Sequence, residues 1–103
     1  MISKRISDLL PAFRQYFQTA PILKAWLFGS YSRGEETAES DIDILVDYDR
    51  TNSRVSLLQM GEMLMDLSEI AGCRVDLVDN RGLMEFARKS VDNDKILIYE
   101  RGN

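Results

Sequence analysis

The sequence predicts an α/β domain in which a small mixed sheet of three to four strands is flanked by helices. Two long segments carry apolar residues at helical spacing, and short runs rich in isoleucine, leucine and valine separate them. The expected order is helix, strand, short helix, strand, helix, strand, helix, which is typical of a sheet covered by helices. With 103 residues, of which 45% are hydrophobic, the chain fits a single domain over residues 1–103.

The first expected element is an amphipathic helix near the N-terminus. Its apolar positions recur at steps of three and four residues: Ile2, Ile6, Leu9, Leu10, Phe13 and Phe17. Pro11 lies inside this pattern and has no backbone N–H, so we expect a kink, or a break into two short helices, near that residue. Pro21 then ends the region.

Two strands follow, with a short helical segment between them. Residues 22–28 (ILKAWLF) form an apolar run that predicts the first strand. Residues 41–48 (DIDILVDY) alternate, which predicts a second strand with one polar face. One face would carry Ile42, Ile44 and Val46, and the other Asp41, Asp43, Leu45 and Asp47.

The second half of the chain predicts the longest helix and the rest of the sheet. Residues 54–71 repeat apolar positions at helical spacing, and Gly72 is suited to end that helix. Residues 73–79 (CRVDLVD) predict a third strand, 83–91 a shorter helix, and 96–99 (ILIY) a strand or a final turn. The core of the long helix is expected to include Leu57, Met60, Met63, Leu64, Met65, Leu67 and Ala71.

Composition excludes several classes of function. The net charge of −4 disfavours a nucleic-acid partner, because the overall field repels phosphate backbones. No histidine is present, so imidazole bases and imidazole metal ligands are excluded. No apolar run reaches the roughly 20 residues of a membrane span, and the single cysteine, Cys73, has no partner for an internal disulfide. These features predict a cytoplasmic protein without membrane association.

The second strand carries two carboxylates that are expected to converge. Residues two apart on a strand share a face, with Cα atoms about 6.5 Å apart, so Asp41 and Asp43 repel each other unless a cation lies between them. Mg²⁺ binds carboxylate oxygens together with substrate phosphates. Asp76, in the third strand, would add a third carboxylate if that strand lies beside the second. Three carboxylates are able to hold two Mg²⁺ ions about 3.5–4 Å apart.

A glycine-serine pair directly follows the first strand. Gly29 permits close approach of an anion, and the Ser30 hydroxyl and nearby backbone N–H groups are expected to face it. Arg33 lies about one helical turn further on and suits a phosphate oxygen, after which Gly34 releases the chain into an acidic loop. The sequence therefore predicts a site for the phosphates of a nucleoside triphosphate beside the metal ligands.

These residues resemble a known family. Gly29-Ser30, ten intervening residues and Asp41-Ile42-Asp43 match the signature of the polymerase-β-like nucleotidyltransferases, and Arg33-Gly34 matches its minimal members. Ser32 stands where that family usually has alanine. The resemblance implies Mg²⁺-dependent transfer of a nucleoside monophosphate, AMP above all, from ATP or another triphosphate to a hydroxyl. It also implies that the protein is similar to antitoxins paired with a helical HEPN toxin.

The sequence leaves three hypotheses open. In the first, an enzyme modifies a hydroxyl of its partner protein, with Asp41, Asp43 and Asp76 as metal ligands and catalytic residues. In the second, a non-catalytic antitoxin keeps the fold and neutralises its partner by contact. In the third, the acceptor is a small molecule such as an aminoglycoside.

Overall fold

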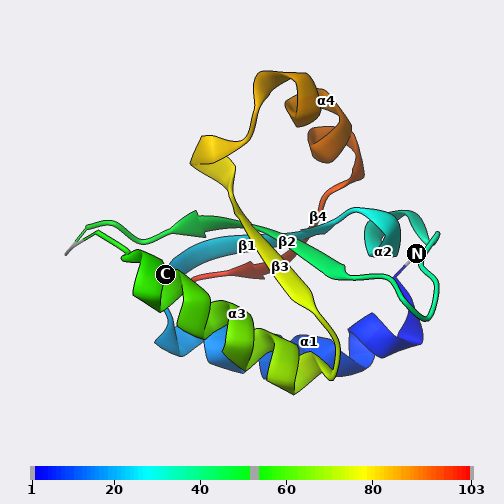
Figure 1. The fold of residues 1–103 in the computed structure, drawn as a ribbon, viewed down its shortest axis with the longest axis horizontal. Coiled ribbons are helices and arrows are strands. Elements are labelled where there is room, and N and C mark those ends of the chain that lie inside the picture. Colours follow the sequence, from blue (N-terminus) through cyan, green and yellow to red (C-terminus); the bar gives the residue numbers. More distant parts are fainter. Residues whose placement is uncertain (1, 52–53, 103) are drawn as a thin grey trace.

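The computed structural model describes residues 2–51 and 54–102 (Figure 1). Helices and strands alternate along these residues in the order that the sequence predicts. The elements are α1 (Lys4–Thr19), β1 (Ile22–Phe28), α2 (Ser30–Arg33), β2 (Ile42–Tyr48), α3 (Leu57–Ala71), β3 (Val75–Asp79), the 3₁₀ turn η1 (Asn80–Gly82), α4 (Glu85–Asp94) and β4 (Ile96–Glu100). No helix in the described ranges is long and apolar enough to cross a membrane.

The four strands form one mixed sheet in the order β3-β2-β1-β4. β1 pairs antiparallel with both β2 and β4, while β2 and β3 are parallel. The parallel pair requires a crossover connection, which α3 supplies. The predicted mixed sheet is therefore confirmed, and the apolar close of the chain is a strand that pairs with β1.

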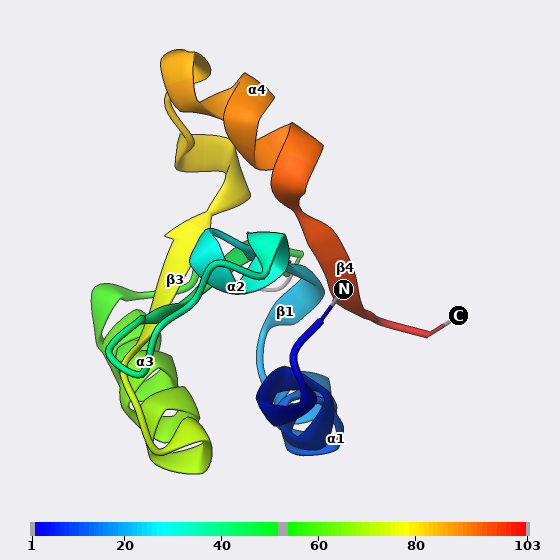
Figure 2. The same ribbon diagram turned by 90° about the vertical axis from the view of Figure 1, so that its right-hand side faces the viewer.

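Helices α1 and α3 cover one face of the sheet, side by side in both views (Figures 1 and 2). Ile42, Ile44 and Val46 point into the core on this face and are fully buried, as the alternation in β2 predicts. On the other face Leu45 is also fully buried, so that face is not purely polar. Cys73 is partly buried against the core.

α1 is one unbroken helix, so of the kink or break expected near Pro11 the break is wrong and the kink stays a prediction. Pro11 is exposed, and the backbone carbonyl that loses its donor belongs to Ser7 one turn earlier, which is also exposed to water. Ile6 and Phe13, before and after the proline, are both buried in the core and hold the two halves of the helix on the same surface.

α3 begins at Leu57, three residues later than predicted. Ser56 caps it: its hydroxyl accepts from the Gln59 N–H, and the Gln59 side chain accepts from the Ser56 N–H. Met63 is buried, but Leu57 and Met65 are exposed by 85% and 73%, so placing those two residues in the core was wrong. Leu57 lies in the first turn and Met65 on the opposite side of the helix from Met63, because two residues rotate the position by about 200°.

The connection from β3 to β4 joins the two opposite edges of the sheet and contains α4. α4 lies on the side of the sheet opposite to α1 and α3 (Figure 2). It has no buried residue. Polar contacts hold its ends: Arg88 donates to the Asn80 carbonyl at 2.6 Å, and the Lys95 ammonium lies 4.9 Å from the centroid of the Trp26 ring. α4 therefore depends on charge and hydrogen bonding for its position.

Candidate active site

The site begins where β1 ends, at Gly29. Its backbone has φ 76° and ψ −156°, a conformation that is essentially limited to glycine. A Cβ atom at this position would collide with the Oδ2 atom of Asp43 on the neighbouring strand. Gly29 thus lets the backbone lie directly against a candidate metal ligand, whereas the sequence assigned the glycine to the close approach of an anion, which stays a prediction.

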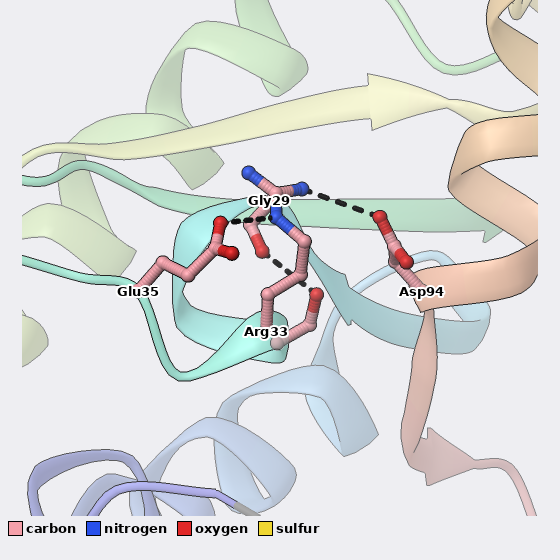
Figure 3. Close-up of polar contacts among 5 residues, drawn as sticks. Gly29, Arg33, Glu35 and Asp94 are labelled. Atoms are coloured by element: carbon pink, nitrogen blue, oxygen red, sulfur yellow. Dashed lines mark hydrogen bonds and ion pairs between the residues drawn. The ribbon is translucent and has the colours of Figure 1, made fainter.

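The single turn of α2 is tied back to Gly29. The carbonyl of Gly29 accepts from the backbone N–H groups of Ser32 (3.1 Å) and Arg33 (3.3 Å) and from the Ser32 hydroxyl (2.8 Å). The dashed line at Gly29 in Figure 3 is the bond that its carbonyl accepts from the Ser32 hydroxyl. Gly34 ends the turn in the left-handed conformation, with its N–H donating to the Ser30 carbonyl. The Ser32 hydroxyl therefore closes the turn, a role that sequence reasoning did not assign to it.

A second contact beneath α2 was also missed. Tyr31 is buried in the core, and its hydroxyl accepts a hydrogen bond from Arg5 at 3.1 Å. The same guanidinium donates to the Ala71 carbonyl at 3.4 Å, so it joins α1, α2 and the end of α3. An aromatic residue next to the glycine-serine pair was the only sequence signal for an anchor under the turn.

The three predicted aspartates come together at one end of the sheet. Asp43 lies opposite Asp76 in the parallel register of β2 and β3, so the third strand does lie beside the second. Asp41 comes just before β2 and is partly exposed. Phe28, the last residue of β1, lies opposite Asp43, which explains why the turn that follows contacts this carboxylate.

The surroundings of Asp43 disfavour the ionised form of its carboxyl group. Its pKa is raised above the ordinary value mainly by burial of the carboxyl group, and further by the negative charges of Asp76 and Asp41. Arg33 and Arg74 lower the pKa of Asp43 but do not reverse the shift. A cation at this point would favour the ionised carboxylate.

Arg74 contacts two of the carboxylates. Its Nε lies 3.2 Å from Oδ1 of Asp76 and 3.9 Å from Oδ2 of Asp41, while its side chain stays 72% exposed. Within residues 2–51 and 54–102, no three carboxylate or thiol groups are gathered as a preformed metal cluster. The raised pKa of Asp43 nevertheless fits a cation, and Asp41, Asp43 and Asp76 carry the oxygen ligands that Mg²⁺ prefers.

Arg33 extends beside the turn between two carboxylates (Figure 3). Its Nε donates to Oε1 of Glu35 at 2.8 Å, and its Nη1 donates to Oδ2 of Asp94 at 3.3 Å. These hydrogen bonds raise the pKa of the already basic guanidinium. Asp94, 61 positions away at the end of α4, was not identified from the sequence.

The other polar residues that the sequence left outside the site have structural partners. Ser40 caps the loop before β2, since its hydroxyl accepts from the Thr37 N–H at 2.8 Å. Asp79 caps η1 through the Arg81 N–H and forms an ion pair with Arg50. Both side chains therefore serve the local backbone.

Comparisons with known proteins agree with this geometry. The chain is 41% identical over 73 residues to a protein of Methanocaldococcus jannaschii named provisionally as a protein adenylyltransferase, covering 70% of this chain and 72% of the relative. It is 36% identical over 72 residues to the protein adenylyltransferase MntA of Thermococcus cleftensis, covering 70% of each.

Two solved structures share the fold. A minimal nucleotidyltransferase superposes with a TM-score of 0.77 at 28% identity, covering 93% of this chain and 95% of that one. A chain of a toxin-antitoxin complex with AMP-PNP superposes with a TM-score of 0.66 at 26% identity, covering 94% of this chain and 72% of that one.

The turn at Gly29 lies against the Asp43 carboxylate on a mixed sheet, and this fold is shared with a solved minimal nucleotidyltransferase. The chain belongs to the polymerase beta nucleotidyltransferase family, whose model matches residues 12–103.

Proposed function

We propose that this protein transfers AMP from ATP to a hydroxyl group of a partner protein and acts as the antitoxin of a HEPN-type toxin. The observation that carries the proposal is the contact at Gly29, where the backbone that would receive phosphates lies against Asp43. Relatives named as protein adenylyltransferases support the nucleotide and the protein acceptor, and the toxin-antitoxin complex with AMP-PNP supports the biological setting.

The residues divide into two groups by their chemistry. Gly29, Ser30 and Arg33 would bind the triphosphate, through backbone approach, a hydroxyl and a guanidinium. Asp41, Asp43 and Asp76 would hold Mg²⁺, which neutralises phosphate charge and lowers the pKa of a bound hydroxyl. No histidine base is required for such a reaction, in agreement with the composition.

The proposed reaction replaces a phosphoanhydride bond of ATP with a phosphodiester bond to the acceptor. The acceptor oxygen forms a bond to the α-phosphorus of ATP, while the bond from that phosphorus to the bridging oxygen breaks and pyrophosphate leaves. The hydroxyl proton passes to a carboxylate oxygen of Asp76 or to water. Arg33 would stabilise negative charge on the departing phosphates.

The acceptor is proposed to be a protein because of the charge of this chain. A net charge of −4 repels nucleic acids and suits a basic protein surface. The carboxylates Asp41 and Asp76 remain partly exposed, with 42% and 35% of their side chains accessible, so a docked partner is able to reach them.

Binding and transfer test the proposal in two stages. First, AMP-PNP with Mg²⁺ should raise the melting temperature of the protein, since ligand binding to the native state stabilises it. Asp43→Asn should lose most of that shift. Asp47→Ala is a matched control, because Asp47 lies on the same strand but bonds to Asn80 at 2.9 Å.

In the second stage, the protein is mixed with its co-purified partner, ATP and Mg²⁺. Mass spectrometry should show discrete AMP increments on the partner, and the double change Asp41→Ala with Asp43→Ala should abolish them. A tight complex that silences the partner without any increment, with any of the four nucleotides, would instead establish neutralisation by contact. The ion pairs of Arg74 with Asp41 and Asp76 favour this second candidate, because they already compensate part of the charge.

A further inference from the structure

The guanidinium of Arg33 is held by two carboxylates, one that is close in the sequence and one that is 61 positions away. Glu35 lies in the loop after α2 and accepts from Nε, while Asp94 is the last residue of α4 and accepts from Nη1 (Figure 3). Asp94 is the less exposed of the two carboxylates, at 27% against 65% for Glu35. The ion pair between Asp94 of α4 and Arg33 is therefore better shielded from solvent than the pair between Glu35 and Arg33.

The location of Asp94 requires an explanation. A negative charge in the last turn of a helix interacts unfavourably with the helix dipole. Asp92, in the same turn, is compensated by Lys95 at 2.9 Å and Arg88 at 3.9 Å. Asp94 pairs instead with Arg33, across to α2. Its charge is thus matched to Arg33 and not to its own helix.

We propose that Asp94, assisted by Glu35, is a positioning residue that fixes the Arg33 guanidinium for the phosphates of the bound nucleotide. The inference rests on the proposed function and deepens it. A guanidinium has five N–H donors, of which these two contacts use two. Both N–H groups of Nη2 and one of Nη1 remain for a phosphate, and the side chain is already ordered before the ligand arrives.

This arrangement also makes α4 part of the nucleotide site. α4 has no buried residue, so its position relative to α2 depends on polar contacts such as the pair between Asp94 and Arg33. A change that loosens Asp94 should therefore reduce nucleotide binding without disturbing the core formed by α1, α3 and the sheet.

The test measures the dissociation constant of AMP-PNP with Mg²⁺ by calorimetry for four proteins: wild type, Asp94→Ala, Asp94→Asn and the control Asp92→Ala. Losing the prearranged guanidinium should weaken binding roughly 2- to 10-fold in Asp94→Ala. Asp94→Asn keeps an oxygen acceptor and should stay within about twofold of wild type, as should Asp92→Ala. In an Arg33→Ala background, Asp94→Ala should have no further effect.

The sign of the change decides between two roles for the carboxylate. If both Asp94→Ala and Asp94→Asn bind AMP-PNP more tightly than wild type, Asp94 competes with phosphate for Arg33 and the positioning role is overturned. Unchanged AMP-PNP affinity in Asp94→Ala also overturns the positioning role. In either case the proposed function stands as long as the wild-type protein binds AMP-PNP. If wild type binds no nucleotide, both proposals fail together. Melting temperatures of the variants confirm that each is folded.

Discussion

Replacing Gly29 with alanine should damage both the fold and the site, for two separable reasons. The backbone conformation at Gly29 costs a non-glycine residue about 1–3 kcal/mol. The new methyl group would also collide with Oδ2 of Asp43, and relief of such overpacking costs a further ~1–3 kcal/mol. We therefore expect a total loss of about 2–6 kcal/mol in the free energy of unfolding.

Gly34→Ala provides the matched control for this change. Gly34 is also left-handed, at φ 71° and ψ 24°, but nothing lies within 4 Å of an added Cβ. The loss should be confined to the backbone cost of about 1–2 kcal/mol. Urea denaturation of both variants, with and without Mg²⁺ and AMP-PNP, measures the stability and the ligand-dependent increment. Only Gly29→Ala should lose that increment.

A double-mutant cycle separates strain from collision. In an Asp43→Ala background the Oδ2 atom is gone, and the nearest remaining atom of residue 43 is its Cβ, at 3.4 Å, an ordinary contact. Gly29→Ala should then cost ~1–3 kcal/mol less than in wild type. An equal cost in both backgrounds would refute the claim that the turn is packed against this carboxylate.

Three further changes test other parts of the structure. Asp43→Asn should stabilise the ligand-free protein at about pH 7 and lose this advantage below about pH 3.9. The reason is that a carboxyl group with a raised pKa in the folded state destabilises the wild-type fold as it ionises with rising pH. Urea unfolding midpoints of both proteins at the two pH values measure the difference. Ser32→Ala should cost about 1 kcal/mol in the free energy of unfolding by removing the bond to Gly29, and should weaken AMP-PNP binding in calorimetry because the turn becomes less rigid. Pro11→Ala should raise the melting temperature, since it restores a backbone donor in α1; an unchanged or lower value contradicts this reading.

The sheet and the long helices could be predicted because their signals are local. Alternation in β2 places Ile42, Ile44 and Val46 in the core, and α3 ends at Gly72 in the left-handed conformation, as expected. Leu57 was misplaced because helical spacing does not show where along the helix the covered part of the apolar face begins. Met65 was misplaced because it was assigned to the core as a methionine, although it lies on the side of α3 opposite to Met63.

In the candidate site too, some features could be expected from the sequence and others could not. Asp76 was expected beside the other aspartates only if the third strand lies beside the second, and the structure pairs β2 with β3 so that Asp43 lies opposite Asp76. The contacts of Arg33 with Asp94 and of Arg5 with Tyr31 span 61 and 26 positions. Charged and hydroxyl side chains occur throughout the chain, so no spacing rule selects these partners before the fold is known.

The long-range contacts share one consequence for the chemistry. Arg5 holds α2 from the side of α1, and Asp94 holds its arginine from the side of α4. The turn is only four residues long and too short to be stable by itself, so these two attachments, with the bonds to Gly29, must supply its rigidity. A phosphate site gains affinity when its donors are fixed in advance. We therefore expect the residues that fix these donors to contribute to the proposed nucleotide binding, alongside the glycine-serine pair.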